Sequence, residues 1–173
     1  ISRVFLKNSL IYTVAGMLPM ASAVILLPFY LQYLPLAQYG ELAFYLAFSM
    51  FVQIAATYSF DSSLYIYYHD YKKDHSQLST LISSAYVFMA MLGLGLLVVL
   101  TLVGDFLFEL ISDDNGISFL PYGFLSVLTA VFQAFFKVHS SLLQTQEKPA
   151  MFFWANLISF SLIAGFTVGG LIL

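Results

Sequence analysis

Five stretches of this chain are each long and apolar enough to cross a lipid bilayer. A membrane-spanning helix needs about 20 mostly apolar residues. Runs such as residues 91–100 show no alternation of apolar and polar side chains, which argues against the strands of a β-barrel. The sequence therefore predicts an all-α, polytopic membrane helix bundle, a single transmembrane domain over residues 1–173. We expect its spans at about residues 8–34, 41–66, 78–103, 119–143 and 150–173.

The overall composition excludes most other classes of protein. Hydrophobic residues make up 61% of the chain and charged residues only 9%. In soluble domains roughly a quarter of all residues are charged. A soluble enzyme could not hide this much apolar surface. The net charge is −3 and no basic block is present, so we expect membrane lipids as the surroundings and no nucleic acid as a partner.

The basic residues indicate how the spans are oriented. All six Lys and Arg residues fall on one side of a five-span arrangement, and cytoplasmic segments carry the excess of Lys and Arg. We therefore expect a cytoplasmic N-terminus and an acidic outer loop at residues 104–118, with a turn at 113–116.

Residues 35–40 should form a tight turn between the first two spans. The chain starts with Ile1 and stops inside an apolar run, so we expect it to be a piece of a longer protein.

Two of the predicted spans carry rows of polar residues along one face. Residues three and four apart share a face of a helix. Such rows either bind neighbouring helices together through hydrogen bonds or face an aqueous cavity. In the second span the row is Ser49, Gln53, Thr57 and Asp61. In the fourth span it is Tyr122, Ser126, Thr129, Gln133, Lys137, Ser140 and Gln144.

The charged members of these rows are the most informative. An ion at the bilayer centre costs roughly 3 kcal/mol. Lys137 could extend its ammonium to the headgroups, and Asp61 lies at the inner end of its span. Alternatively, both face a cavity open to the cytoplasm and contact a charged or sugar-bearing substrate, or each other. We take as candidate substrate-pathway residues Gln53, Thr57, Asp61, Gln133, Lys137 and Asn156, the last of which could instead bond within the bundle.

The first span contains two prolines, Pro19 and Pro28. Proline removes a backbone hydrogen bond and bends a helix, and bent helices open and close cavities in transporters. The two prolines are therefore candidate hinges. The alternative is that they are simply tolerated, as prolines in membrane helices often are.

No pattern in the chain indicates catalysis. The His-containing segment at residues 69–75 matches no metal-ligand spacing and is best explained as a solvated loop. There is no cysteine, no nucleophile elbow, no phosphate-binding loop and no dinucleotide fingerprint. We therefore expect neither an enzyme nor a metal or cofactor, and any transport would draw on an ion gradient or on the gradient of the substrate.

Several short segments resemble bacterial polysaccharide flippases, in the superfamily that also holds the multidrug MATE exporters and the lipid II flippases. The resemblance covers nearly the whole chain. One departure is Lys137, near a position where family members often have Arg, which makes an anion-pairing role there less secure. The segments that carry the resemblance are residues 8–12, 27–31, 34–40, 60–68, 133–137 and 144–149.

The resemblance implies a transporter of two similar lobes, of which this chain would supply about five helices of the first. It would move lipid-linked oligosaccharide, the repeat unit of O-antigen, capsule or other polysaccharide, across the bacterial cytoplasmic (inner) membrane by alternating access. The partners would be a polyprenyl-pyrophosphate glycan and the missing C-terminal lobe or a second subunit. Alternatives are an ion-coupled MATE-like exporter, a membrane glycan polymerase or ligase, and a non-transporting assembly subunit.

Overall fold

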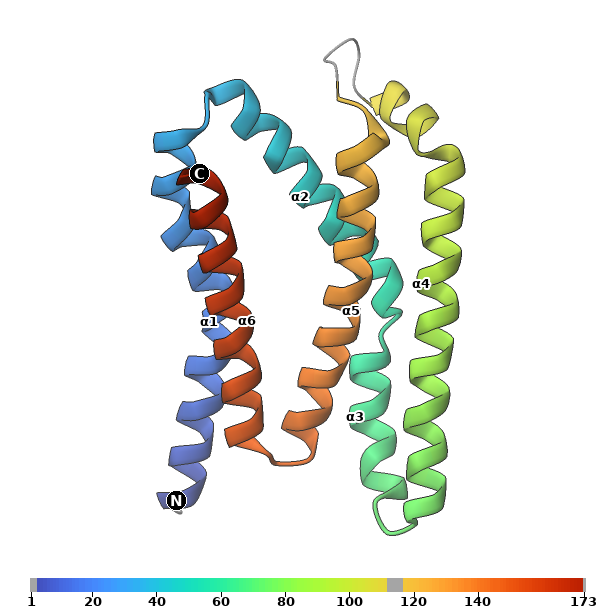
Figure 1. The fold of residues 1–173 in the computed structure, drawn as a ribbon. Coiled ribbons are helices and arrows are strands. Elements are labelled where there is room, and N and C mark those ends of the chain that lie inside the picture. The colour runs from blue at the N-terminus through green and yellow to red at the C-terminus, as the bar shows by residue number, and fades with distance from the viewer. Residues whose placement is uncertain (1–2, 112–116, 173) are drawn as a thin grey trace. The chain divides into compact units, whose positions relative to one another are not determined.

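The structure, a computed structural model, describes residues 3–111 and 117–172, and every element in those ranges is helical (Figure 1). Five candidate membrane spans are present in this part of the chain, with α2 and α3 together making the second. The predicted all-α membrane bundle of about five spans is thus confirmed. The elements are α1 (Arg3–Tyr33), α2 (Leu36–Thr57), α3 (Phe60–Tyr71), α4 (His75–Ile111), η1 (Phe119–Gly123), α5 (Phe124–Thr145) and α6 (Pro149–Ile172).

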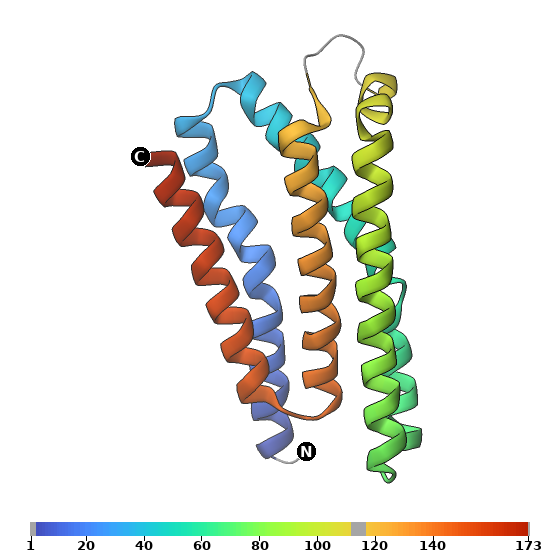
Figure 2. The same cartoon turned by 45° about the vertical axis from the view of Figure 1, so that its right-hand side comes forward.

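The chain divides into two compact units. The terminal unit comprises Ile1–Gly40 and Leu143–Leu173, and the central unit comprises Glu41–Leu142. In the terminal unit α1 and α6 lie side by side over most of their lengths (Figure 2). Ala15 is fully buried there beside Leu143 and Phe152, and the Tyr12 ring meets the Phe152 ring edge to face.

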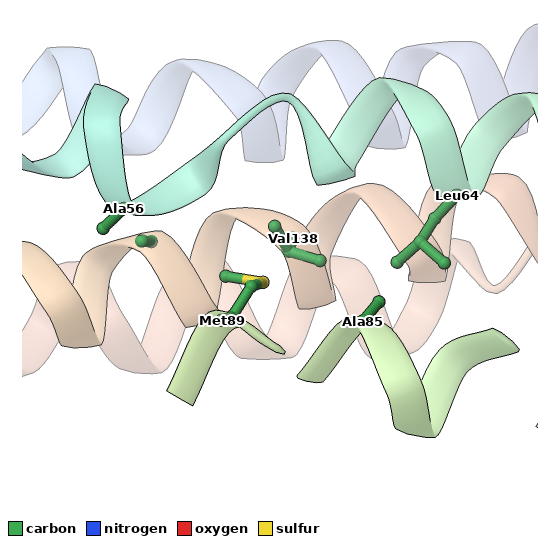
Figure 3. Close-up of a cluster of buried hydrophobic side chains, with 6 residues drawn as sticks. Ala56, Leu64, Ala85, Met89 and Val138 are labelled. Atoms are coloured by element: carbon green, nitrogen blue, oxygen red, sulfur yellow. The ribbon is translucent and has the colours of Figure 1, made fainter. Parts of the chain in front are cut away.

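The central unit contains two buried apolar clusters. The first cluster joins α2, α3, α4 and α5, and its side chains converge in Figure 3. It consists of Ala56, Leu64, Ala85, Met89, Ala134 and Val138. The second cluster lies where α2, α4, η1 and α5 meet, and much of it is aromatic, with Phe108 and Phe119 almost fully buried. Its buried members are Val52, Phe108, Phe119, Val127 and Ala130.

The structure interrupts the second span, which the sequence predicts as one continuous helix over residues 41–66. Helix α2 ends at Thr57 and α3 begins at Phe60 (Figure 1). Between them, Tyr58 and Ser59 have φ angles of 45° and 59°, in the left-handed region. That conformation costs roughly 1–2 kcal/mol for each residue that carries a Cβ. Neither Gly nor Pro marks this position, so the break depends on tertiary packing and not on a local signal.

Two predicted connections are shorter in the structure. Helix α2 begins at Leu36, so the turn expected at residues 35–40 is limited to the residues around Pro35. Helix α4 runs to Ile111, so Asp105 and Glu109, expected in the outer loop, lie on its last turns. The predicted loop begins at Gly104, but a glycine inside an apolar membrane helix need not end the helix. The turn expected at 113–116 lies outside the described residues.

Candidate functional site

The polar row on α5 lies largely on the surface of the central unit. Gln133 and Lys137 are exposed, while the adjoining face of α5 is buried through Ala134 and Val138. The helix therefore packs its apolar side inward and presents its amide and ammonium groups outward. Polar groups that face acyl chains are costly, so this face needs an aqueous cavity or another protein segment against it. The other exposed members of the row within the central unit are Tyr122 and Thr129.

The polar row on α2 is more buried than the row on α5. Ser49 and Thr57 are 5% and 2% exposed, and Gln53 is half-buried. The Thr57 hydroxyl donates to the backbone oxygen of Gln53 at 2.7 Å, one turn back in the same helix. Thr57 therefore satisfies its hydroxyl inside α2, at the last residue before the interruption.

Two buried serine hydroxyls in the central unit have no hydrogen-bond partner among the described residues, Ser49 Oγ and Ser140 Oγ. One belongs to the α2 row and the other to the α5 row. Buried hydroxyls are nearly always paired with protein groups or water. Both rows therefore retain hydrogen-bonding capacity that the central unit itself does not fill.

The two charged residues of the rows meet. Lys137 Nζ on α5 lies 3.3 Å from Asp61 Oδ2 on α3, with side-chain exposures of 51% for the lysine and 22% for the aspartate. The Ser141 hydroxyl, one turn beyond Lys137, donates to the backbone oxygen of Asp61 at 3.1 Å. The sequence left open whether Asp61 and Lys137 contact headgroups, a substrate or each other. The structure shows that they contact each other. The pairing offsets the cost of each charge, and half of the lysine side chain remains accessible.

Asp61 reaches Lys137 because of the interruption. It lies in the first turn of α3, two residues after the left-handed Ser59. A carboxylate in the first turn of a helix is stabilised by the backbone N–H groups at that end. The unusual backbone at residues 58–59 thus sets the start of α3, and with it the position of the carboxylate.

The other predicted residues lie in the terminal unit. Asn156 on α6 is 3% exposed, and its Nδ2 donates to the backbone oxygen of Phe152 at 2.8 Å. Helix α1 stays helical through Pro19 and Pro28, and the Ser22 hydroxyl donates to the Pro19 oxygen at 2.6 Å. A pathway role for Asn156 and hinge roles for the prolines stay predictions.

Three features of this region were not expected from the sequence. The first is the pair of left-handed residues, Tyr58 and Ser59. The second is Ser141, which lies beside the polar row and whose bond to α3 has no sequence signal. The third is His139, which lies off the row and whose Nδ1 is 3.3 Å from the Tyr86 hydroxyl on α4. The contacts of Ser141 and His139 join different helices, so the sequence alone does not reveal them.

A comparison with protein families places this arrangement in a known group. The family model described as polysaccharide biosynthesis protein matches residues 5–173, nearly the entire chain. The chain belongs to this family. The five apolar spans and the family together indicate a multi-pass membrane protein with a transport role connected to polysaccharide. No curated protein and no solved structure matches the chain.

The exposed row on α5 predicts a specific pattern of thiol reactivity. The chain has no cysteine, so each single replacement gives one unique thiol. In the full-length protein in membranes, Cys at Thr129 or Gln133 should react with a water-soluble maleimide several-fold faster than Cys at Leu125 or Phe132. A thiol facing water ionises and reacts, whereas one facing lipid does not.

The comparison has a built-in control, because Leu125 and Phe132 are themselves 51% and 66% exposed on the chain. Slow labelling at these two positions therefore cannot be caused by burial within this chain. Equal labelling rates at all four positions would contradict an aqueous face on α5.

Proposed function

We propose that this protein translocates lipid-linked oligosaccharide across the bacterial cytoplasmic membrane by alternating access. The observation that carries the proposal is the outward-facing polar row of α5, with a half-accessible Lys137 ammonium beside Asp61. It is supported by membership of the polysaccharide biosynthesis family. A wet face along one membrane helix suits a hydrophilic substrate that must cross the bilayer, while its polyprenyl tail stays in lipid.

The side chains of the row suit the chemistry of this substrate. Sugars carry many hydroxyl groups. These groups can donate hydrogen bonds to, and accept them from, amides and hydroxyls such as those of Gln53, Thr129 and Gln133. The Lys137 ammonium suits the pyrophosphate group, with which it can form charge-assisted hydrogen bonds. These residues bind and orient, and no catalytic step, metal or cofactor is assigned to them.

The proposed orientation places the N-terminus in the cytoplasm, because the basic residues fall on one side of the five spans. A cavity that alternates between the two membrane faces needs a second lobe opposite α5. We assign that lobe to the remainder of a longer polypeptide or to a second subunit.

A deletion experiment tests this function. Cells without the gene should lose the surface polysaccharide and accumulate its lipid-linked repeat units in the inner leaflet, and the full-length gene should restore export. A strain that also lacks the first glycosyltransferase is the control, because it makes no precursor to accumulate. Normal surface polysaccharide in the deletion strain would contradict the proposal. If that strain also became sensitive to cationic drugs, a MATE-like exporter would be the better explanation.

A further inference from the structure

The C-terminal half of the interrupted second span, α3, is held by apolar packing near its start and by polar contacts to α5. Helix α3 is 12 residues long, and Leu64 is its buried residue. Leu64 packs in the cluster with Ala85 and Met89 of α4 and Val138 of α5 (Figure 3). Phe60 packs against the same cluster, and its ring centroid lies 5.5 Å from that of Phe88 on α4. The polar contacts to α5 add to this packing at the first turn of α3.

Those polar contacts are both made by a single residue at the start of α3. The Asp61 carboxylate pairs with Lys137 at 3.3 Å, and the Asp61 backbone oxygen accepts the Ser141 hydroxyl at 3.1 Å. Lys137 and Ser141 are one turn apart on α5. The first turn of α3 is thus held to α5 at one point, immediately after the interruption.

The interruption itself is suited to bending. Tyr58 and Ser59 both have a left-handed conformation that is unfavourable for residues other than glycine, and α3 has no side-chain cap bond from Ser59. Hinges in moving proteins are a few element-terminal residues that absorb changes in φ and ψ. A change at these two residues would relax the strained backbone and alter the angle between α2 and α3.

The ion pair is placed to respond to an anion. Half of the Lys137 side chain is accessible, so a phosphate group can approach its ammonium without displacing a buried side chain. A multiply charged phosphate at that distance would repel the Asp61 carboxylate, which is 22% exposed and poorly hydrated. The phosphate and Asp61 therefore compete for the same lysine.

We propose that the Asp61–Lys137 pair is a latch that an anionic substrate group opens. A diphosphate that binds Lys137 displaces Asp61, and the released α3 swings about Tyr58 and Ser59. Binding of the headgroup thereby causes α3 to move. The identity of the anion rests on the proposed function, whereas the latch between α3 and α5 does not.

Distance measurements between spin labels test the latch in the full-length protein in lipid. One label is placed at Ile66 of α3 and the other at Phe132 of α5, both of which are exposed. The unmodified pair should give a narrow distance distribution. Inorganic pyrophosphate should add a second population shifted by about 5 Å, the scale of one helical turn. Asp61→Asn and Lys137→Met should each produce that population without pyrophosphate.

The reversed pair, Asp61→Lys with Lys137→Asp, should restore the narrow distribution. This result would show that the single variants act through the ion pair. Asp70→Asn, which removes an exposed carboxylate at the other end of α3, is the matched control and should change nothing. Sodium chloride at equal ionic strength controls for charge screening.

An unchanged distribution in both single variants would overturn the latch. A shift in the variants, but none with pyrophosphate in the parent protein, would overturn its opening by a diphosphate. Failure of the proposed function would be seen separately, as normal surface polysaccharide in the deletion strain.

Discussion

Replacing Gln133 and Lys137 together by leucine is expected to abolish export of the polysaccharide, with a loss of at least tenfold. The two side chains lie one turn apart on the exposed face of α5 and are proposed to hold the sugar and the pyrophosphate group. Leucine removes every hydrogen-bond donor and the positive charge at these positions. Each charge-assisted hydrogen bond contributes about 1.5–3 kcal/mol, and a 1.4 kcal/mol loss corresponds to tenfold in an equilibrium constant. The measurement is surface polysaccharide, quantified in the deletion strain that carries the variant gene.

Insertion of this variant into the membrane should be unaffected, because leucine is favoured over lysine and glutamine inside a bilayer. Membrane abundance of the tagged protein checks this point. Phe132→Leu, next to Gln133 but off the polar row, is the matched control and should export normally. Normal export by the double leucine variant at equal abundance would remove Gln133 and Lys137 from the substrate pathway.

The spans and polar rows could be predicted from the sequence because they depend on local patterns. Length and apolar composition decide which segments can cross a bilayer. The spacing of three and four residues places Gln133 and Lys137 on one face of any helix over that segment. The same spacing puts Ala134 and Val138 together on the adjoining face, which is buried. These properties need no knowledge of neighbouring helices.

The interruption could not be predicted, and the ion pair only as one of several possibilities, since both depend on packing between helices. Residues 57–59, Thr-Tyr-Ser, contain no glycine or proline, and the left-handed residues are flanked by Ala56 and Leu64, which are buried against α4 and α5. The sequence places Asp61 and Lys137 toward the same membrane face but leaves several partners open to each. Their pairing follows from the position of α3, which the break determines.

Substitution of Gly104 by leucine is expected to prevent the central unit from folding. Gly104 is a buried residue of α4, and a Cβ atom there would lie 2.5 Å from Cγ and Cδ2 of Phe119. The Phe119 ring is fully buried and is held edge to face by Phe108 and Phe48, with centroid distances of 5.5 and 6.5 Å. It therefore has no free space to move into. Overpacking in a tight core typically costs about 1–3 kcal/mol, and leucine adds three further carbons beyond the clashing Cβ.

Gly95 provides the matched comparison, because it lies on the same helix and a Cβ there meets nothing within 4 Å. The two substitutions change helix propensity equally, so the difference between them reports the contact with Phe119. Gly104→Leu should be nearly absent from the membrane fraction, and Gly104→Ala should lower the melting temperature of the purified protein. Gly95→Leu and Gly95→Ala should be at least as abundant and as heat-stable as the parent. Equal abundance and melting of the Gly104 and Gly95 variants would show that α4 and η1 do not approach one another this closely, and the aromatic cluster that fixes the start of α5 would then need another arrangement.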